Sequence, residues 1–129
     1  LGPERNATQV ELSQTDCRSI GINAPVRDSG DLEGTPGIKL RGPLGEIEIP
    51  KGVIIADRHI HMSPADAERF GLKDGDRVKV KIDGVKPGVM EHVLIRSGEK
   101  HRLDMHIDTD DGNAFMLKQG QLVTVLGKE

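Results

Sequence analysis

The residues best suited to chemistry stand at positions 58–63, where the chain reads Arg-His-Ile-His-Met-Ser. Alternate residues of an extended strand project from the same face, about 6.6 Å apart along the strand. If the strand that we predict from Val53 continues through this segment, His59 and His61 can bind one metal ion from two sides. The alternative is a pair of polar surface residues on an edge strand, because short His-x-His matches are often fortuitous.

A third histidine, His106, stands at the end of another predicted strand, just before the acidic run at 108–111. It can complete a three-histidine set that leaves positions open for water or substrate, as in catalytic zinc sites. The alternative is a core histidine with its hydrogen bonds satisfied. Asp108 can orient a histidine, whereas the acidic run lacks the spacing of an EF-hand calcium loop. His92 and His101 stand among charged residues, and we expect both to face solvent.

Several charged residues are candidates for binding anions. Arg5, Arg27 and Arg58 each stand beside turn residues, where a guanidinium can donate two parallel hydrogen bonds to phosphate oxygens. Taken singly, each is more often a surface charge. Glu11 lies in a predicted strand of alternating pattern, and the sequence alone favours a solvated carboxylate there.

The elements that must position these residues are mostly strands. Sixteen Gly and seven Pro separate short apolar runs, the pattern of a small β-barrel or sandwich. Within 77–82, valine and isoleucine alternate with arginine and lysine, as in a half-buried strand. Gly45 favours a tight hairpin, and we expect an ordered loop at 23–36. The predicted strands are Thr8–Ser13, Gly37–Arg41, Glu46–Ile49, Val53–Ala56, Arg77–Ile82, Val89–Ser97, Arg102–Ile107 and Gln121–Leu126.

One helix is well marked directly after the His-x-His segment. Ser63 can cap it, Pro64 suits its first position, and Gly71 can end it. A second short helix is predicted at 15–20, and we find no convincing internal repeat. The histidine pair therefore lies at a strand-to-helix junction, where ligands are often exposed.

Composition narrows the class of protein. The 129 residues fit one compact domain or two very small ones, with a net charge of −3, two Phe, and neither Trp nor Tyr. A general nucleic-acid binder is therefore not expected, because basic patches and stacking aromatics are its usual signs. Cys17 is the only cysteine and lacks a neighbouring histidine, so we expect a small buried or partly exposed thiol rather than a nucleophile. We expect no membrane association and a cytoplasmic location.

Several segments, in order, resemble the PduL-type phosphate propanoyltransferases, the phosphotransacylases of bacterial microcompartments. The resemblance covers nearly the whole chain, and its motifs together are specific. They are Thr-Gln-Val-Glu-Leu-Ser at 8–13, Ala-Pro-Val-Arg-Asp-Ser-Gly-Asp-Leu at 24–32, Gly-Thr-Pro-Gly at 34–37, the His-x-His segment at 58–63 with Ala-Asp-Ala at 65–67, and Met-His-Ile-Asp-Thr-Asp at 105–110.

The resemblance implies a mainly β fold with two small β-barrels capped by short helices. We expect a central barrel region at 1–56 and a C-terminal one at 57–129, which carries the His-x-His motif. The implied protein is a homodimer with two metal ions, usually zinc. The implied reaction converts acyl-CoA and phosphate into acyl phosphate and coenzyme A, with propanoyl as the expected acyl group and acetyl as an alternative.

Matched motif by motif, the resemblance also assigns roles to residues. His59, His61 and His106 would hold one metal ion and Glu11 the second. Arg5 would bind the incoming phosphate. Arg27 and Ser29 would contact coenzyme A.

The chain departs from the family in one respect. The family has an earlier His-x-His segment, upstream of the point where this sequence starts, and the sequence opens without Met. We therefore expect a fragment in which one barrel is incomplete and the second metal ion lacks ligands. Such a fragment is expected to be inactive by itself, and to lack the peptide that directs some members into a microcompartment.

Two other functions stay open. The region 71–80 also resembles barrel modules attached to molybdopterin enzymes, which predicts a non-catalytic cofactor-binding module without zinc. A metal-dependent thioesterase or other hydrolase would use the same histidines, but it would transfer the acyl group to water without phosphate. The order of the motifs favours the acyltransferase over both.

Overall fold

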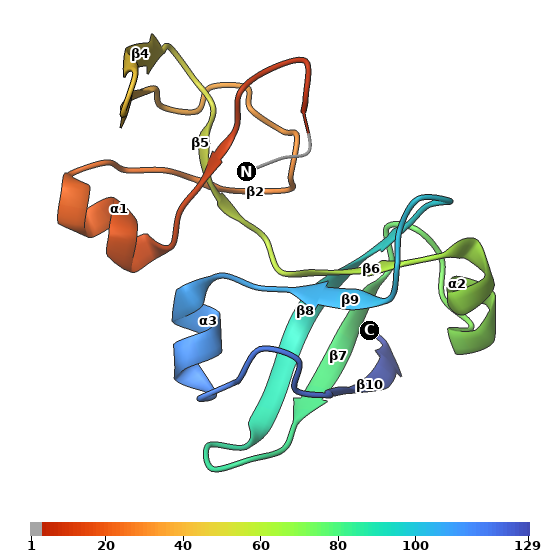
Figure 1. Cartoon of the computed structure of the whole chain (residues 1–129). Helices are drawn as coiled ribbons and strands as arrows, with labels where there is room; N and C mark the ends of the chain where they lie inside the picture. The colour runs from red at the N-terminus through yellow and green to blue at the C-terminus, as the bar shows by residue number, and fades with distance from the viewer. Residues whose placement is uncertain (1–3) are drawn as a thin grey trace. The chain divides into compact units, whose positions relative to one another are not determined.

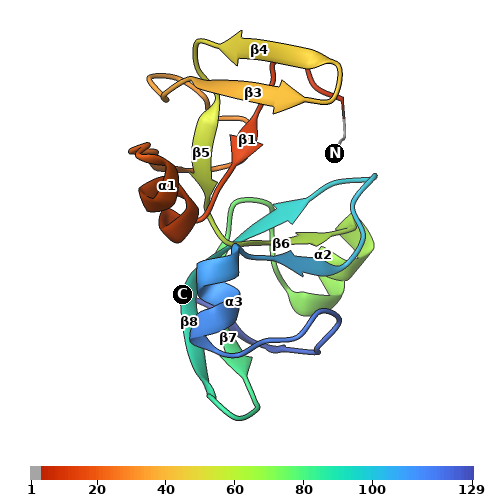
Figure 2. The same ribbon diagram turned by 60° about the vertical axis from the view of Figure 1, so that its left-hand side comes forward.

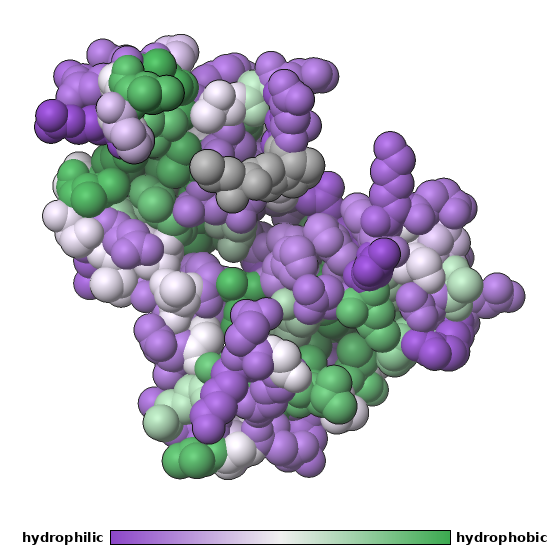
Figure 3. Space-filling model, viewed as in Figure 1, coloured by the Kyte–Doolittle hydropathy of each residue, from purple (hydrophilic) through white to green (hydrophobic). Residues whose placement is uncertain are grey.

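The computed structural model describes residues 4–129 and divides the chain into two compact units (Figure 1). We call Leu1–Ala56 the N-terminal unit and Asp57–Glu129 the C-terminal unit. On the face shown in Figure 3, hydrophilic side chains predominate, with hydrophobic patches between them. Within the described part of the chain, no helix has the length and apolar character needed to cross a membrane.

The N-terminal unit is built around one buried strand, β5 (Val53–Ala56), which pairs in parallel with β1 (Val10–Glu11) and β2 (Val26–Arg27). Helix α1 (Gln14–Ile20) begins after Ser13, whose side chain accepts a hydrogen bond from the helix backbone. The small core of this unit consists of Cys17, Ala24, Val53 and Ile55.

A hairpin completes the N-terminal unit, formed by β3 (Ile38–Gly42) and β4 (Gly45–Ile49), which lie side by side in Figure 2. Gly45 has a positive φ of 144°, which permits the tight turn and agrees with the predicted hairpin. Lys39 and Arg41 both form ion pairs with Glu46 across the two strands.

The C-terminal unit contains a five-stranded sheet in the order β10-β7-β8-β6-β9. Strand β6 pairs in parallel with β8 and antiparallel with β9, so it is flanked on both sides, as Figure 1 shows. The strands are β6 (His59–Met62), β7 (Arg77–Ile82), β8 (Gly88–Ser97), β9 (Asp104–His106) and β10 (Thr124–Lys128).

The core of the C-terminal unit is larger than that of the N-terminal unit. Burying each large aliphatic side chain contributes about 1.5–3 kcal/mol to stability. Hydrophobic burial therefore stabilises the sheet of this unit more than that of the N-terminal unit. The alternation predicted in β7 is confirmed, because its hydrophobic residues are buried. The buried residues are Ile60, Met62, Ala67, Leu72, Val78, Val80, Ile82, Met90, Val93 and Ile95.

Two further helices belong to this unit. Helix α2 (Pro64–Phe70) begins after Ser63 and ends at Gly71, as predicted. Helix α3 (Thr109–Ala114) was not predicted, because its acidic first turn resembles a loop in sequence. Asp108 caps α3 by accepting a hydrogen bond from the backbone N–H of Asp111.

The mainly β class with a few short helices is confirmed. The strand predicted at Val53–Ala56 is confirmed as β5, but it does not continue through the His-x-His segment, which forms β6 in a different sheet. The loop expected at 23–36 contains the short strand β2. The sheets of residues 4–129 are open rather than closed, so the two barrels stay a prediction.

Candidate metal centre

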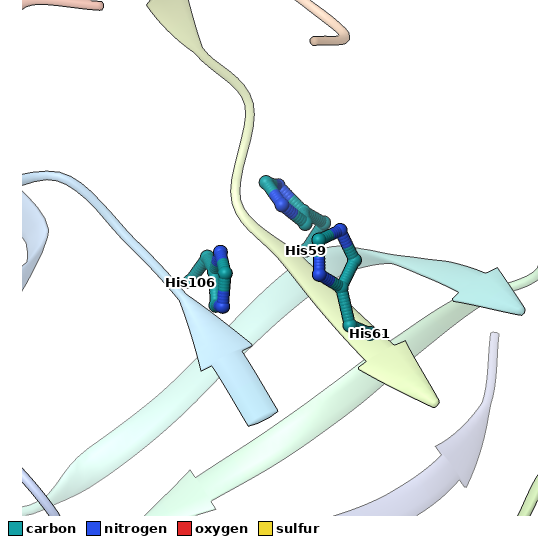
Figure 4. A group of neighbouring side chains, drawn as sticks. All are labelled: His59, His61 and His106. Atoms are coloured by element: carbon teal, nitrogen blue, oxygen red, sulfur yellow. The ribbon is translucent and has the colours of Figure 1, made fainter. Parts of the chain in front are cut away.

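Three histidines from two neighbouring strands converge in the C-terminal unit (Figure 4). His59 and His61 alternate along β6, and β9 places His106 directly opposite His59. One ring nitrogen from each histidine lies within 4.8 Å of the others. The sheet thus supplies the third donor that the His-x-His segment lacks by itself.

The surroundings of His59 fix the tautomer of its ring. His59 is 5% exposed, and its Nδ1 lies 2.8 Å from the backbone carbonyl oxygen of Asp57. A carbonyl can only accept, so Nδ1 carries the proton and Nε2 keeps its lone pair. The interpretation as polar surface residues on an edge strand is therefore wrong, since His59 is buried and β6 has a partner on each side.

The ring of His61 is held in the neutral form that metals require. Burial, followed by the neighbouring His59, His101 and His106, lowers the pKa of His61 from 6.5 to about 4. At neutral pH few protons therefore compete with a metal ion for this ring.

A fourth histidine, His101, was expected to face solvent, and that expectation is wrong. Its ring stacks on His61, with 4.2 Å between the centroids and 13° between the planes. Its Nδ1 lies 2.9 Å from the carbonyl oxygen of Arg96. The charged neighbours concealed this role in the sequence, and the turn at Gly98 that folds the segment back was the available signal. For His92 the same expectation is confirmed, since its side chain is 70% exposed.

The carboxylate next to the cluster is not the predicted one. Asp108 was expected to orient a histidine, but its side chain caps α3. The carboxylate of Asp104 lies 3.5 Å from Nε2 of His106, and Asp104 stands opposite His61 across the two strands.

These donors fit a divalent metal ion. Three imidazole nitrogens within 4.8 Å of one another, with one tautomer fixed, match the ligand set of catalytic zinc sites. Three protein donors leave coordination positions open for a substrate atom.

A second polar cluster lies in the N-terminal unit and unites three of the predicted site residues. Gln9 donates hydrogen bonds to Glu11 (2.5 Å) and Ser29 (3.0 Å), and Arg5 donates to Ser29 (3.1 Å). Gln9 was not proposed as a site residue, although its place two residues before Glu11 on one strand face was the available signal. A cavity of about 440 Å³ adjoins this cluster, lined by Glu4, Arg5, Asn6, Ala7, Gln9, Gly30 and Leu32.

Arg58, Arg27 and Cys17 complete the account of the predicted residues. Nε of Arg58 lies 3.7 Å from a carboxylate oxygen of Asp111. Arg27 lies in β2, and its Nε is 3.4 Å from a carboxylate oxygen of Asp31, without hydrogen-bond geometry. Cys17 is fully buried, which is one of the two predicted alternatives. A buried thiol is not available to attack a substrate.

Comparison with known proteins identifies relatives of this chain. The family model of phosphate propanoyltransferase matches residues 1–118. A protein of Thermotoga maritima named phosphate propanoyltransferase is 54% identical over 127 residues, which cover 98% of this chain and 60% of that protein. Proteins of the same name from Sebaldella termitidis and Salmonella typhimurium are 48% and 54% identical, over 99% and 88% of this chain and 61% and 55% of theirs.

The chain thus spans about 60% of the length of the curated relatives that it matches. Within that length the similarity runs through both units, including the segments that carry the two polar clusters. The chain belongs to the phosphate propanoyltransferase family.

Proposed function

We propose that this chain is part of an enzyme that interconverts acyl-CoA and phosphate with acyl phosphate and coenzyme A. The observation that carries the proposal is the convergence of His59, His61 and His106 in a chain of this family. A binding module without catalysis would not need three histidine donors at one point.

In this proposal the three histidines hold one divalent ion, with zinc as the expected metal. Glu11 would hold the second ion of the family, together with ligands from the part of the relatives that this chain does not span. A bound metal ion supplies Lewis-acid chemistry, because it polarises a thioester carbonyl and stabilises the leaving thiolate.

Arg5 is proposed to bind phosphate. Arg5 lines the cavity in the N-terminal unit, and its guanidinium donates to Ser29, whose hydroxyl also contacts Gln9. A guanidinium can donate two parallel hydrogen bonds to phosphate oxygens and so orient one of the other two oxygens for attack. Ser29 and Arg27 are proposed to contact coenzyme A.

The reaction that suits these groups is direct transfer in a ternary complex. A phosphate oxygen attacks the thioester carbonyl carbon, the new C–O bond forms, the C–S bond breaks, and the electron pair leaves on the coenzyme A sulfur. No acyl-enzyme is needed, which agrees with the burial of Cys17, the single thiol of the chain. Detection of an acylated protein, or ping-pong kinetics, would refute this mechanism.

The remaining parts of the proposal rest on the family resemblance. We expect propanoyl as the acyl group with acetyl as a second substrate, and a homodimer that works in the cytoplasm, inside a microcompartment in hosts that build one. We also expect the open sheets to be completed into two barrels in the whole-length protein.

The test is thiol release from propanoyl-CoA, with and without phosphate. The protein assayed is loaded with metal and includes this chain together with the part of its relatives that the chain does not span. We expect release only with phosphate, and a loss of at least about 100-fold in kcat for His59→Ala and for Arg5→Ala. Matched controls are His92→Ala and Arg41→Ala, which remove an exposed histidine and an exposed arginine from the same two units.

Other outcomes would select other functions. Release without phosphate would indicate a thioesterase. No release by a protein that also binds no metal would favour the cofactor-binding module. Equal losses in the site variants and their controls would show that these residues have no special part in the reaction.

A further inference from the structure

The contacts around His59 continue beyond the backbone oxygen that it meets. Asp57, whose carbonyl oxygen accepts the hydrogen bond of His59, also has a side chain held in place by Arg77. The guanidinium NH1 of Arg77 lies 2.6 Å from Oδ2 of Asp57 and 3.1 Å from the carbonyl oxygen of His92. The other carboxylate oxygen of Asp57 accepts the backbone N–H of Arg58.

The sheet register explains why these groups meet. Leu94 of β8 stands opposite His59 on one side and opposite Arg77 on the other. Arg77 therefore lies at the same level of the sheet as the metal-binding strand, two strands away. From there it reaches the residues that lead into β6.

The ion pair between Arg77 and Asp57 is shielded from solvent more than is usual for a surface pair. The side chains of Arg77 and Asp57 are 26% and 20% exposed. On the same strand Lys79 forms an ion pair of the same 2.6 Å length with Glu91, but these side chains are 46% and 62% exposed. Exposed pairs contribute little to stability, whereas a shielded charge-assisted hydrogen bond fixes geometry.

We propose that Arg77 and Asp57 are positioning residues for the metal centre, acting through the hydrogen bond that orients the His59 ring. This inference rests on the proposed function only in requiring that the three histidines bind a metal ion. Arg77 holds the Asp57 carboxylate, the carboxylate accepts the backbone N–H of Arg58, and the Asp57 carbonyl keeps the ring proton of His59 on Nδ1. Groups that orient a metal ligand in this way usually change metal affinity about 10-fold to 100-fold.

The experiment is a Co²⁺ titration of the intact chain, followed by the absorption bands of the bound ion. We expect Arg77→Met and Asp57→Asn each to weaken Co²⁺ binding by about 10-fold or more and to alter the absorption bands. Arg77→Lys keeps the charge and should recover part of the affinity. The double variant Arg77→Met, Asp57→Asn should bind Co²⁺ about as tightly as the single variant that has the lower affinity, because both substitutions break the same chain of contacts.

The matched control is Lys79→Met, which removes an ion pair of equal length from the same strand. It should leave the Co²⁺ affinity and spectrum as they are in the unsubstituted chain. If Arg77→Met binds Co²⁺ as tightly as Lys79→Met, the inference is wrong even if Arg77→Met lowers the melting temperature. If the unsubstituted chain binds no Co²⁺, the metal centre of the proposed function fails, and this inference fails with it.

Discussion

The two units contain the same local motif, a strand followed by a short helix. Helices α1 and α2 each have seven residues and begin after a serine, Ser13 or Ser63, that caps an aspartate N–H three residues later. Each ends at a glycine in the left-handed conformation, Gly21 or Gly71. The match lies in the helix caps rather than in overall sequence identity, which agrees with the absence of a convincing internal repeat in the sequence.

The strands before these helices differ where chemistry is expected. The residue four positions before the capping serine is Gln9 in the first motif and His59 in the second. The residue two positions before the serine is Glu11 in the first motif and His61 in the second. Strand β1 lies at the edge of its sheet, whereas β6 has a partner on both sides. The comparison teaches that the motif provides two positions on one face, and that a neighbouring strand must provide the third donor.

Loss of a histidine donor should have the largest effect. We expect His61→Ala to weaken metal binding by the intact chain at least about 100-fold, because one of three donors is lost. Isothermal titration with Zn²⁺ measures this effect. Binding as tight as in the unsubstituted chain would show that the metal ion does not use the three-histidine cluster.

A transplant tests the comparison itself. The double variant Gln9→His, Glu11→His copies the His-x-His pattern onto β1 and the residue just before it. We expect it to bind no second metal ion tightly, because no described strand supplies a third donor beside β1. A second tight equivalent in the same titration would contradict the need for a neighbouring strand.

Next in size is the effect of the core beneath β6. Ile95 is fully buried and stands opposite Ile60 of β6. We expect Ile95→Ala to lower the free energy of unfolding by about 2–5 kcal/mol, as urea denaturation would show. Leu44→Ala, at a fully exposed position of the N-terminal unit, is the control and should change it little.

The pH dependence of metal-free protein should show an effect of intermediate size. Between pH 6.5 and about 4, His61 stays neutral in the folded chain but is protonated in the unfolded chain. The unfolded state then binds more protons, so stability should fall as the pH falls through this window. Melting temperatures measured with a chelator should show this, and His61→Gln should make the decline shallower. An equal decline in His61→Gln would assign the effect to other groups.

The smallest effect concerns the caps that the two motifs share. Ser13→Ala and Ser63→Ala should each cost about 1 kcal/mol, because each removes the acceptor for a helix N–H. Urea denaturation measures both, with Ser13→Asn and Ser63→Asn as controls that keep an acceptor. If the two serine-to-alanine substitutions lower the free energy of unfolding by widely different amounts, the two motifs share their geometry but not the stability that their caps contribute.

Local signals in the sequence predicted much of the fold. Ser63, Pro64 and Gly71 fix the ends of α2 by local hydrogen bonding and backbone conformation, so the helix was predictable. Strand β7 was predictable because its side chains alternate between core and solvent. The short strands β1 and β2 depend on pairing with β5, which is remote in sequence, and their bounds could not be found from local pattern.

The candidate site divides in the same way. The spacing of His59 and His61 gave the pair, and His106 was named from its place at the end of a predicted strand, but the strand pairing that brings the three together is a long-range property. The stacking of His101 depends on a turn after β8 and was missed. Arg77 appeared as one charge on the solvent side of β7, and its contact with Asp57 depends on the order of three strands.

The strand order also bears on how the protein is made. Strands β7 and β8 form a local antiparallel pair, whereas β6 must wait for β8, and β9 must add to β6 after both have formed. Local hairpins generally form faster than parallel or distant pairings. On the ribosome His59 and His61 emerge before His106, so the three-histidine cluster can form only after β9 has paired with β6, and metal capture should mark the chains in which this pairing is complete.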